Sequence, residues 1–209
     1  MTILTFPAAV RRPSLVSWRP MALTQVHTSP FDGSSQTLAM PGARWRASVS
    51  WNNLPLASWR ILGAFVASLG GRAGRFTFGP PQGWRRATST ITGPVLVNGA
   101  GQTGSSLAVD GLPNSVVVFE IGDWISWPNA ASRPQLHQIT AQATSNGSGQ
   151  ATLAIVPPLR GSPADNAVVT TTDPLGVFML ADDEQGESVH SGERPDKASI
   201  SLDIMEALR

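Results

Sequence analysis

Residues 44–69 read RWRASVSWNNLPLASWRILGAFVASL and contain the two patterns that decide the fold. In residues 44–51, polar and apolar side chains alternate, which is typical of a strand with one buried face. The face that this alternation buries carries Trp45, Ala47, Val49 and Trp51. A chain that buries two tryptophans on one strand needs a substantial core, so the first prediction is a folded β-rich domain.

The second pattern predicts a helix over residues 55–69, because apolar side chains recur there every three to four residues. These side chains are Trp59, Leu62, Phe65, Val66 and Leu69. Asn53 is expected to cap the N-terminus of this helix, and Pro55 suits its first turn. Gly70 and Gly71 supply the left-handed backbone that ends a helix.

Two more strands are expected to belong to the same domain. Residues 75–78 (RFTF) place two phenylalanines on one side, and residues 198–208 alternate with Ile200, Leu202 and Ile204 on one face. The last strand is too short to fold alone, so we expect it to pair with the first region. This gives a discontinuous domain of residues 1–88 with 173–209, and a second domain of residues 89–172 inserted into it.

The inserted region is expected to be entirely β. Glycine, proline, asparagine or aspartate separates short strand-like segments at residues 90–97, 106–109, 115–120, 124–127, 135–141 and 151–156. Residues 146–149 (NGSG) are a strong hairpin signal. The predicted fold class is therefore mainly β, a β-sandwich with one helix plus an inserted small β-barrel or β-sandwich domain. Residues 182–184 (DDE) and 186–195 are expected to form an exposed loop.

The charged residues are divided unevenly along the chain. Residues 1–109 contain ten arginines and a single acid, Asp32, for a formal charge of +9; the rest contain five basic and thirteen acidic residues, for −8. Such a division indicates either nucleic-acid binding or a contact between copies. Arginines alternate with tryptophans that are expected to be buried, and Lys197 is the only lysine. Because arginine suits bidentate protein contacts, we favour a protein interface over nucleic acid.

No catalytic, cofactor-binding or metal-binding residue can be assigned from the sequence, and we expect the protein not to be an enzyme. Residues 99–104 (GAGQTG) match a dinucleotide-binding pattern, but Gly111 and Pro113 leave no room for the helix that such a site requires. The three histidines are far apart, and residues 182–184 lack the spacing of a calcium loop. The absence of cysteine excludes disulfides, thiolate metal sites and cysteine nucleophiles.

Membrane insertion is not expected either. No apolar run reaches the ~20 residues that span a bilayer, and the arginine pair near the N-terminus follows the apolar residues, unlike a secretory signal. We therefore expect a soluble protein that stays in the cytoplasm until it assembles with a partner.

The order of several short motifs resembles that of tail structural proteins of tailed bacteriophages, of the distal-tail or minor-tail type. In the first region these motifs are residues 29–36 (SPFDGSSQ), 41–45 (PGARW) and 69–76 (LGGRAGRF). In the second they are residues 122–125 (GDWI), 149–153 (GQATL) and 157–160 (PPLR), followed by the return at 176–180 (GVFML).

This resemblance implies a tail-tube-like β-sandwich flanked by one helix, with a long hairpin or arm. It also implies a homo-oligomeric ring, often a hexamer, that joins the tail tube protein to the tail tip or baseplate hub proteins of the virion, with assembly in the host cytoplasm. The inserted domain is then expected to lie on the outside, where it can touch receptor-binding proteins or host sugars.

In such a ring, arginines of one copy can meet acids of its neighbour. The candidate interface residues are Arg44, Arg46, Arg72, Arg75, Arg85, Arg86, Asp182, Asp183 and Glu184. The alternative function is a carbohydrate-binding adhesion module that uses the inserted domain, with Trp124 and Trp127 as stacking platforms. Their spacing places these two tryptophans on opposite faces of a strand, so at most one is expected to be exposed.

Overall fold

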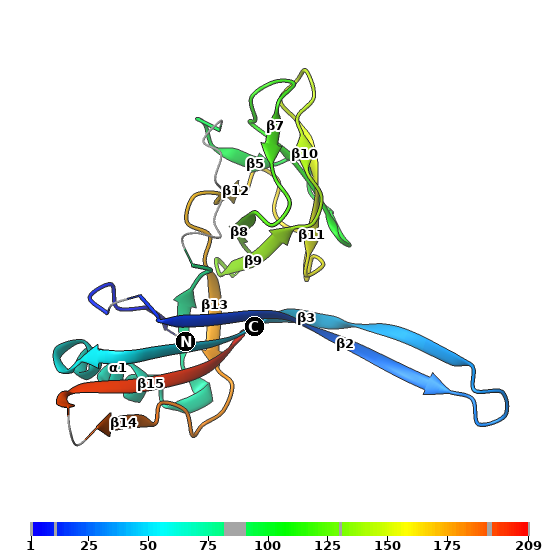
Figure 1. The fold of residues 1–209 in the computed structure, drawn as a ribbon. Coiled ribbons are helices and arrows are strands. Elements are labelled where there is room, and N and C mark those ends of the chain that lie inside the picture. The colour runs from blue at the N-terminus through cyan, green and yellow to red at the C-terminus, as the bar shows by residue number, and fades with distance from the viewer. Residues whose placement is uncertain (1, 11, 82–90, 130, 192–193, 209) are drawn as a thin grey trace.

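The computed structural model describes residues 2–10, 12–81, 91–129, 131–191 and 194–208. Within them the protein is mainly β with one α-helix, as the sequence predicts. A seven-stranded sheet forms the base of the molecule (Figure 1). Its strands follow the order β1 (Ile3–Thr5), β4 (Arg75–Phe78), β13 (Gly176–Leu180), β15 (Arg194–Glu206), β3 (Ser35–Pro55) and β2 (Leu15–Thr28), and β14 (Ser188–Ser191) pairs with β15.

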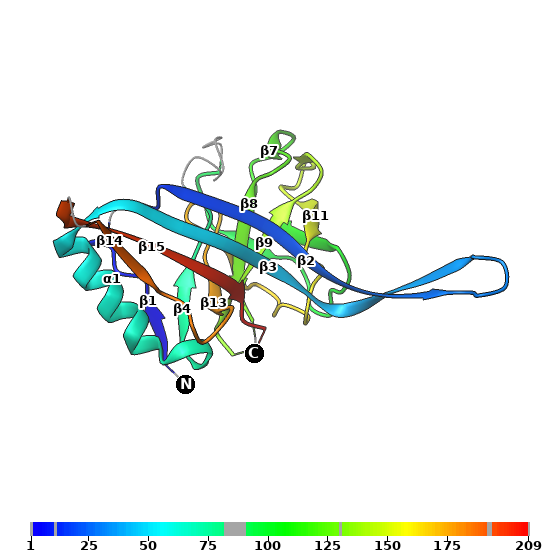
Figure 2. The ribbon, with the colours of Figure 1, turned by 60° about the horizontal axis from the view of Figure 1, so that its bottom comes forward.

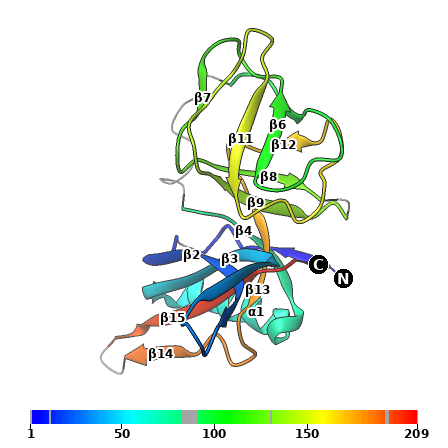
Figure 3. The same ribbon diagram turned by 90° about the vertical axis from the view of Figure 1, so that its right-hand side faces the viewer.

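A second group of strands stands on this base and curls into a nearly closed barrel (Figure 3). Six strands follow the order β12 (Val168–Val169), β5 (Val95–Val97), β6 (Ser106–Asp110), β11 (Ala151–Val156), β9 (Pro134–Ile139) and β8 (Trp124–Pro128). β7 (Val117–Phe119) and β10 (Ala143–Thr144) form a small separate pair. We call the first group the base and the second group the barrel.

Residues 44–51 belong to β3, which lies inside the sheet of the base between β15 and the edge strand β2. Trp45, Ala47, Val49 and Trp51 are all buried, as the alternation predicts. The neighbouring strand β15 pairs with β3 in antiparallel register, with Leu202 opposite Val49 and Ile204 opposite Ala47. Directly opposed residues point to the same face of a sheet, so the apolar faces of the two strands form one core.

The helix α1 (Leu56–Leu69) is also confirmed, and it buries Leu62, Val66 and Leu69 against the base. Gly70 ends it with a left-handed φ of 61°, as predicted, and a 3-10 helix, η1 (Gly71–Ala73), follows. The predicted cap is wrong. Asn53 still belongs to β3, which runs on to Pro55, so the chain enters the helix directly from the strand and Pro55 caps it without a side-chain hydrogen bond.

The predicted turn at residues 146–149 is confirmed, and the Asn146 N–H donates there to the carbonyl of Gln150 at 2.8 Å. The two strands that it was predicted to join, β9 and β11, pair in antiparallel register with Ile139 opposite Ile155. Between them, the short strand β10 pairs with β7. The predicted exposed loop at 186–195 is wrong in part, because β14 pairs with β15 there. Residues 187–191 (ESVHS) lack an apolar alternation, and only the neighbouring strand makes them extended.

Candidate functional site

The most distinctive surface is a long hairpin built from β2 and the first half of β3. The two strands leave the base together and extend far beyond it (Figures 1 and 2). Apart from Ser29, every residue from 22 to 40 is exposed. We call residues 22–40 the arm. Its strands pair with each other in register from Leu23 opposite Met40 to Thr28 opposite Ser35, and among the described residues no third strand pairs with them there.

Both faces of the arm carry apolar side chains that are exposed to solvent. Leu23, Leu38 and Met40 share one face of the hairpin and are 39%, 59% and 46% exposed, and Val26 lies on the other face at 56%. His27 and Asp32 are the only ionisable side chains between residues 20 and 43. A two-stranded hairpin is marginally stable in water, and grouped apolar side chains on it indicate a protein contact.

The tip of the arm holds one aromatic side chain in a defined turn. Phe31 is 98% exposed. The chain reverses around it through a hydrogen bond from the Ser29 N–H to the Ser34 carbonyl (2.8 Å) and one from the Gly33 N–H to the Ser29 carbonyl (3.1 Å). Asp32 accepts from the backbone and the hydroxyl of Ser34. Hydrogen bonds from the hydroxyl of Ser29 and then from Ser34 lower the pKa of Asp32 to about 2, so this carboxylate is charged at neutral pH.

Arg44 and Arg46 lie where the alternation of β3 places them, on the face opposite Trp45. Arg19 of β2 is directly opposite Arg46, so three guanidinium groups share the outer face of the base. Arg46 is 3.9 Å from Asp203, in a pair whose side chains are each about one third exposed. Arg44 lies 3.9 Å from the sulfur of Met205. This outer face carries three arginines together with the acids Asp203, Glu184 and Glu187, and it stays a candidate interface.

Arg75 makes hydrogen bonds within its own chain. Its Nη1 donates to the carbonyls of Arg72 (2.7 Å), Ala73 (3.1 Å) and Gly74 (2.9 Å) and so fixes the turn after η1. Burial, and then the cation of Arg133, lower its pKa. The Nη1 atom of Arg75 is thus held by its own chain, and the place of Arg75 at an interface stays a prediction.

The acidic loop lies next to the same turn. The N–H of Arg72 donates to Oδ1 of Asp183 at 2.7 Å, so the structure joins these two candidate residues within one copy. Asp183 stays a candidate interface residue through its other carboxylate oxygen. Asp182, Glu184 and the side chain of Arg72 are exposed and stay candidates. Arg85 and Arg86 lie outside the described residues.

Trp124 and Trp127 are not sugar-stacking platforms, because each is only 1% exposed. They lie on opposite faces of β8, as the spacing predicts. Trp124 packs on Trp45 of the base with ring centroids 4.5 Å apart. Trp127 points into the barrel and stacks on His137 at 4.1 Å with an interplanar angle of 10°. Both rings are thus occupied by the two cores.

His137 is completely buried beneath that tryptophan. Its Nδ1 lies 2.8 Å from the carbonyl oxygen of Pro157, which makes Nδ1 the protonated nitrogen. Burial, and then the cation of Arg160, lower the pKa of His137 to about 3, against the opposing effect of that carbonyl. The imidazole is therefore neutral at physiological pH and acts as a packed core residue.

A buried ion pair that the sequence analysis missed joins the barrel to the base. Arg160 donates to both carboxylate oxygens of Glu206 and, through Nε, to the carbonyl of Ala43 at 3.1 Å. The N–H groups of Trp45 and Leu136 also donate to Glu206, each at 3.2 Å. The Arg160 side chain is 10% exposed and that of Glu206 1%. Base and barrel therefore meet through a desolvated, fully bonded carboxylate.

A sequence signal for this pair exists. The alternation that buries Ile200, Leu202 and Ile204 continues to residue 206, so it places Glu206 on the apolar face of β15. A carboxylate on such a face requires a cation and hydrogen-bond donors. Only the fold identifies Arg160 as that cation, because it lies 46 residues away along the chain.

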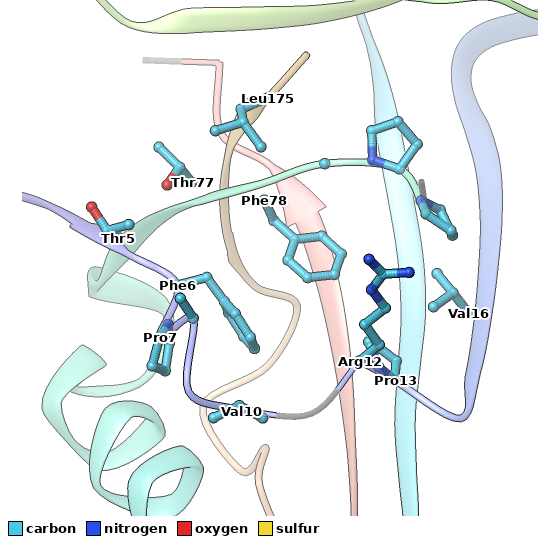
Figure 4. Close-up of a pocket in the computed structure, with 14 residues that line it drawn as sticks. Thr5, Phe6, Pro7, Val10, Arg12, Pro13, Val16, Thr77, Phe78 and Leu175 are labelled. Carbon is cyan, nitrogen blue, oxygen red and sulfur yellow. The ribbon is translucent and has the colours of Figure 1, made fainter. Parts of the chain in front are cut away.

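An apolar pocket of about 410 Å³ opens where the segment between β1 and β2 passes the end of β4 (Figure 4). Its walls include Phe6, Val10, Val16, Phe78, Pro80 and Leu175, and Arg12 lies at its side. A second pocket, of about 480 Å³, is polar and lies on the outer face of the base between Ser48 and Glu187.

In the described part of the chain, no three histidine, aspartate or glutamate side chains are grouped so that they could hold a metal ion. Neither α1 nor any other helix among these residues has the length and apolar character needed to cross a membrane. In comparisons with known proteins, no family model and no curated protein matches this chain.

Proposed function

We propose that the protein is a structural component of a bacteriophage tail, which forms a closed homo-oligomeric ring between the tail tube and the tail tip or baseplate hub. The observation that carries this proposal is the arm. It is a long, paired, largely uncharged hairpin whose described residues are exposed except for Ser29. The chain resembles tail proteins in the order of its motifs, and a long arm on a one-helix β-domain is what that resemblance implies.

The arm leads to a ring by symmetry. It leaves one side of the base, so a neighbour can bind it with a different surface, and we propose that this contact is heterologous. Repeated contacts of this kind form a ring when the rotation between copies closes, and the resemblance makes six copies the expected number. The edge strands of the base, β1 and β2, can extend the sheet into neighbouring copies and so protect their unpaired backbone groups.

The junction between base and barrel supports a role as a rigid building block. The Arg160–Glu206 pair and the Trp45–Trp124 contact hold the barrel in one orientation on the base. A ring of such copies presents its barrels at regular positions, where tail tip, hub or receptor-binding proteins can bind. The proposed location is accordingly the virion, with assembly in the host cytoplasm.

The test is to shorten the arm in the full chain. A variant in which a two-residue Asn-Gly turn replaces residues 24–39 keeps the base strands and the barrel intact. We expect the natural protein to form one discrete oligomer in light scattering after size exclusion, and the shortened variant to remain a monomer with an unchanged β-type circular dichroism spectrum. An equal oligomer from both proteins would overturn the role of the arm.

A further inference from the structure

We propose that Phe31 at the tip of one arm inserts into the apolar pocket beside β4 of the next copy. This inference rests on the proposed ring and names the contact that closes it. The two parts are a single exposed aromatic side chain and a pocket of matching chemistry. Each copy carries both parts, so one contact type serves every interface of the ring.

Phe31 has the two properties of an interface anchor, because it is exposed and its turn is already ordered. The hydrogen bonds of Ser29, Gly33 and Ser34 fix the turn before any partner binds, so little conformational entropy is lost on docking. A phenylalanine that becomes buried removes about 150–250 Å² from water, and aromatic anchors of this kind dominate interface energetics. Phe31, at 98% exposure, has nearly all of that area still to lose.

The pocket can accept such a ring. Phe6 and Phe78 face it together with Val10, Val16 and several prolines, so its walls are aliphatic and aromatic (Figure 4). An apolar cavity of about 150 Å³ accommodates a benzene molecule. The volume of about 410 Å³ therefore holds the phenylalanine ring and leaves room for part of Pro30 beside it.

The two parts cannot meet within one copy. The pocket is built on the segment that joins β1 to β2, which lies at the end of the base opposite the arm (Figures 1 and 2). The tip lies at the far end of the molecule. The contact therefore joins two copies, and it closes a ring when it repeats head to tail.

The charges beside the tip and beside the pocket also favour Phe31 as the occupant of the pocket. Asp32 follows Phe31, is ionised at neutral pH, and is the only acid in the first 109 residues. Arg12 lines the side of the pocket. When Phe31 enters, Asp32 comes to the rim, where the guanidinium group of Arg12 can stabilise it.

Photo-crosslinking of the full chain tests the contact directly. Phe31 is replaced by the photoreactive analogue p-benzoylphenylalanine, which retains an aromatic ring, and the crosslinked peptides are mapped by mass spectrometry. We expect intermolecular crosslinks to residues 5–16 and 77–81. Oligomers whose crosslinks map elsewhere, or that give none, would overturn this inference and leave the proposed ring intact. Absence of any oligomer in the natural protein would reject the ring and this inference with it.

Two substitutions give an independent measurement. Phe31→Ala removes the side chain from the tip, and Ala8→Phe fills the pocket at an exposed lining position. Each should weaken association at least about tenfold, as expected for an interface anchor. Ile121→Ala, at a 70% exposed position of the barrel, is the matched control and should leave association unchanged. Association of both variants within twofold of the control would contradict the proposal.

Discussion

Arg160 and Glu206 form a bidentate ion pair across the junction between barrel and base, with the Arg160 Nη1 2.9 Å from Oε1 of Glu206. The carboxylate accepts from two backbone N–H groups as well. Every partner of this buried glutamate comes from another segment of the chain. The ion pair can therefore form only when the barrel is packed on the base.

Removing the carboxylate should be strongly destabilising. Glu206→Ala leaves the Arg160 cation and the N–H groups of Trp45 and Leu136 without their acceptor. We expect the free energy of unfolding to fall by about 3–5 kcal/mol. Urea denaturation followed by tryptophan fluorescence measures the loss, because Trp45 and Trp124 lie at the junction.

The exposed pair between Arg46 and Asp203 provides a matched control. Asp203→Ala should cost about 0–1 kcal/mol, since the two side chains are 32% and 39% exposed. Similar losses for Glu206→Ala and Asp203→Ala would show that the buried pair does not hold the barrel on the base.

The stability of the protein should fall as the pH falls below about 6.5, because of His137. Its pKa in the folded protein, about 3, lies below the ordinary value of 6.5. Between these values the unfolded chain binds a proton that the folded protein does not, so acid favours unfolding. From pH 7 to pH 4 this effect amounts to about 3 kcal/mol.

His137→Phe removes the titrating group and keeps an aromatic ring against Trp127. Urea denaturation at pH 7 and pH 4 should show a smaller acid-induced loss in this variant than in the natural protein. An identical pH dependence in the two proteins would mean that His137 is not buried in the neutral form.

Assembly should protect the backbone of the arm from hydrogen exchange. In a dilute monomer the arm amides, residues 22–40, are expected to exchange rapidly, because an isolated hairpin opens readily. In the oligomer their exchange should slow by at least about tenfold, whereas residues 200–204 of β15 should be protected in both states. Fast exchange of the arm in a stable oligomer would place the interface elsewhere.

Salt should weaken association before it unfolds the protein. The outer face of the base carries Arg19, Arg44 and Arg46, and the exposed acids Asp182 and Glu184 lie on another segment. Raising NaCl from about 50 mM to about 1 M shortens the screening length from more than 10 Å to about 3 Å, so contacts between these charges lose strength. Sedimentation velocity at both salt concentrations measures the effect, and an unchanged dissociation constant would make the charge division incidental.

The fold was predictable where one short-range pattern determines both structure and burial. The alternation in residues 44–51 and the helical spacing in residues 55–69 each give a buried face, and both predictions are confirmed. The prediction that Asn53 caps the helix is wrong, and the loop prediction is wrong at residues 188–191, because β3 runs on to Pro55 and β14 pairs with β15. Local propensity does not contain that information.

The candidate site was less predictable, because exposure depends on which surfaces meet. Arginine on β3 is outside as expected, but the spacing of Trp124 and Trp127 could not show that two different cores cover both faces of β8. The resemblance to tail proteins predicted the arm. The pattern of apolar residues in 22–40 did not, because these side chains face no core. Arg160 has no local signal at all.

Electron microscopy of the purified full-length protein tests the central claim most directly. The account predicts closed rings of uniform size, with the arm of each copy lying on its neighbour and the barrels at regular positions around the ring. A protein that remains monomeric at high concentration, and that does not assemble when tail tube is added, would contradict it.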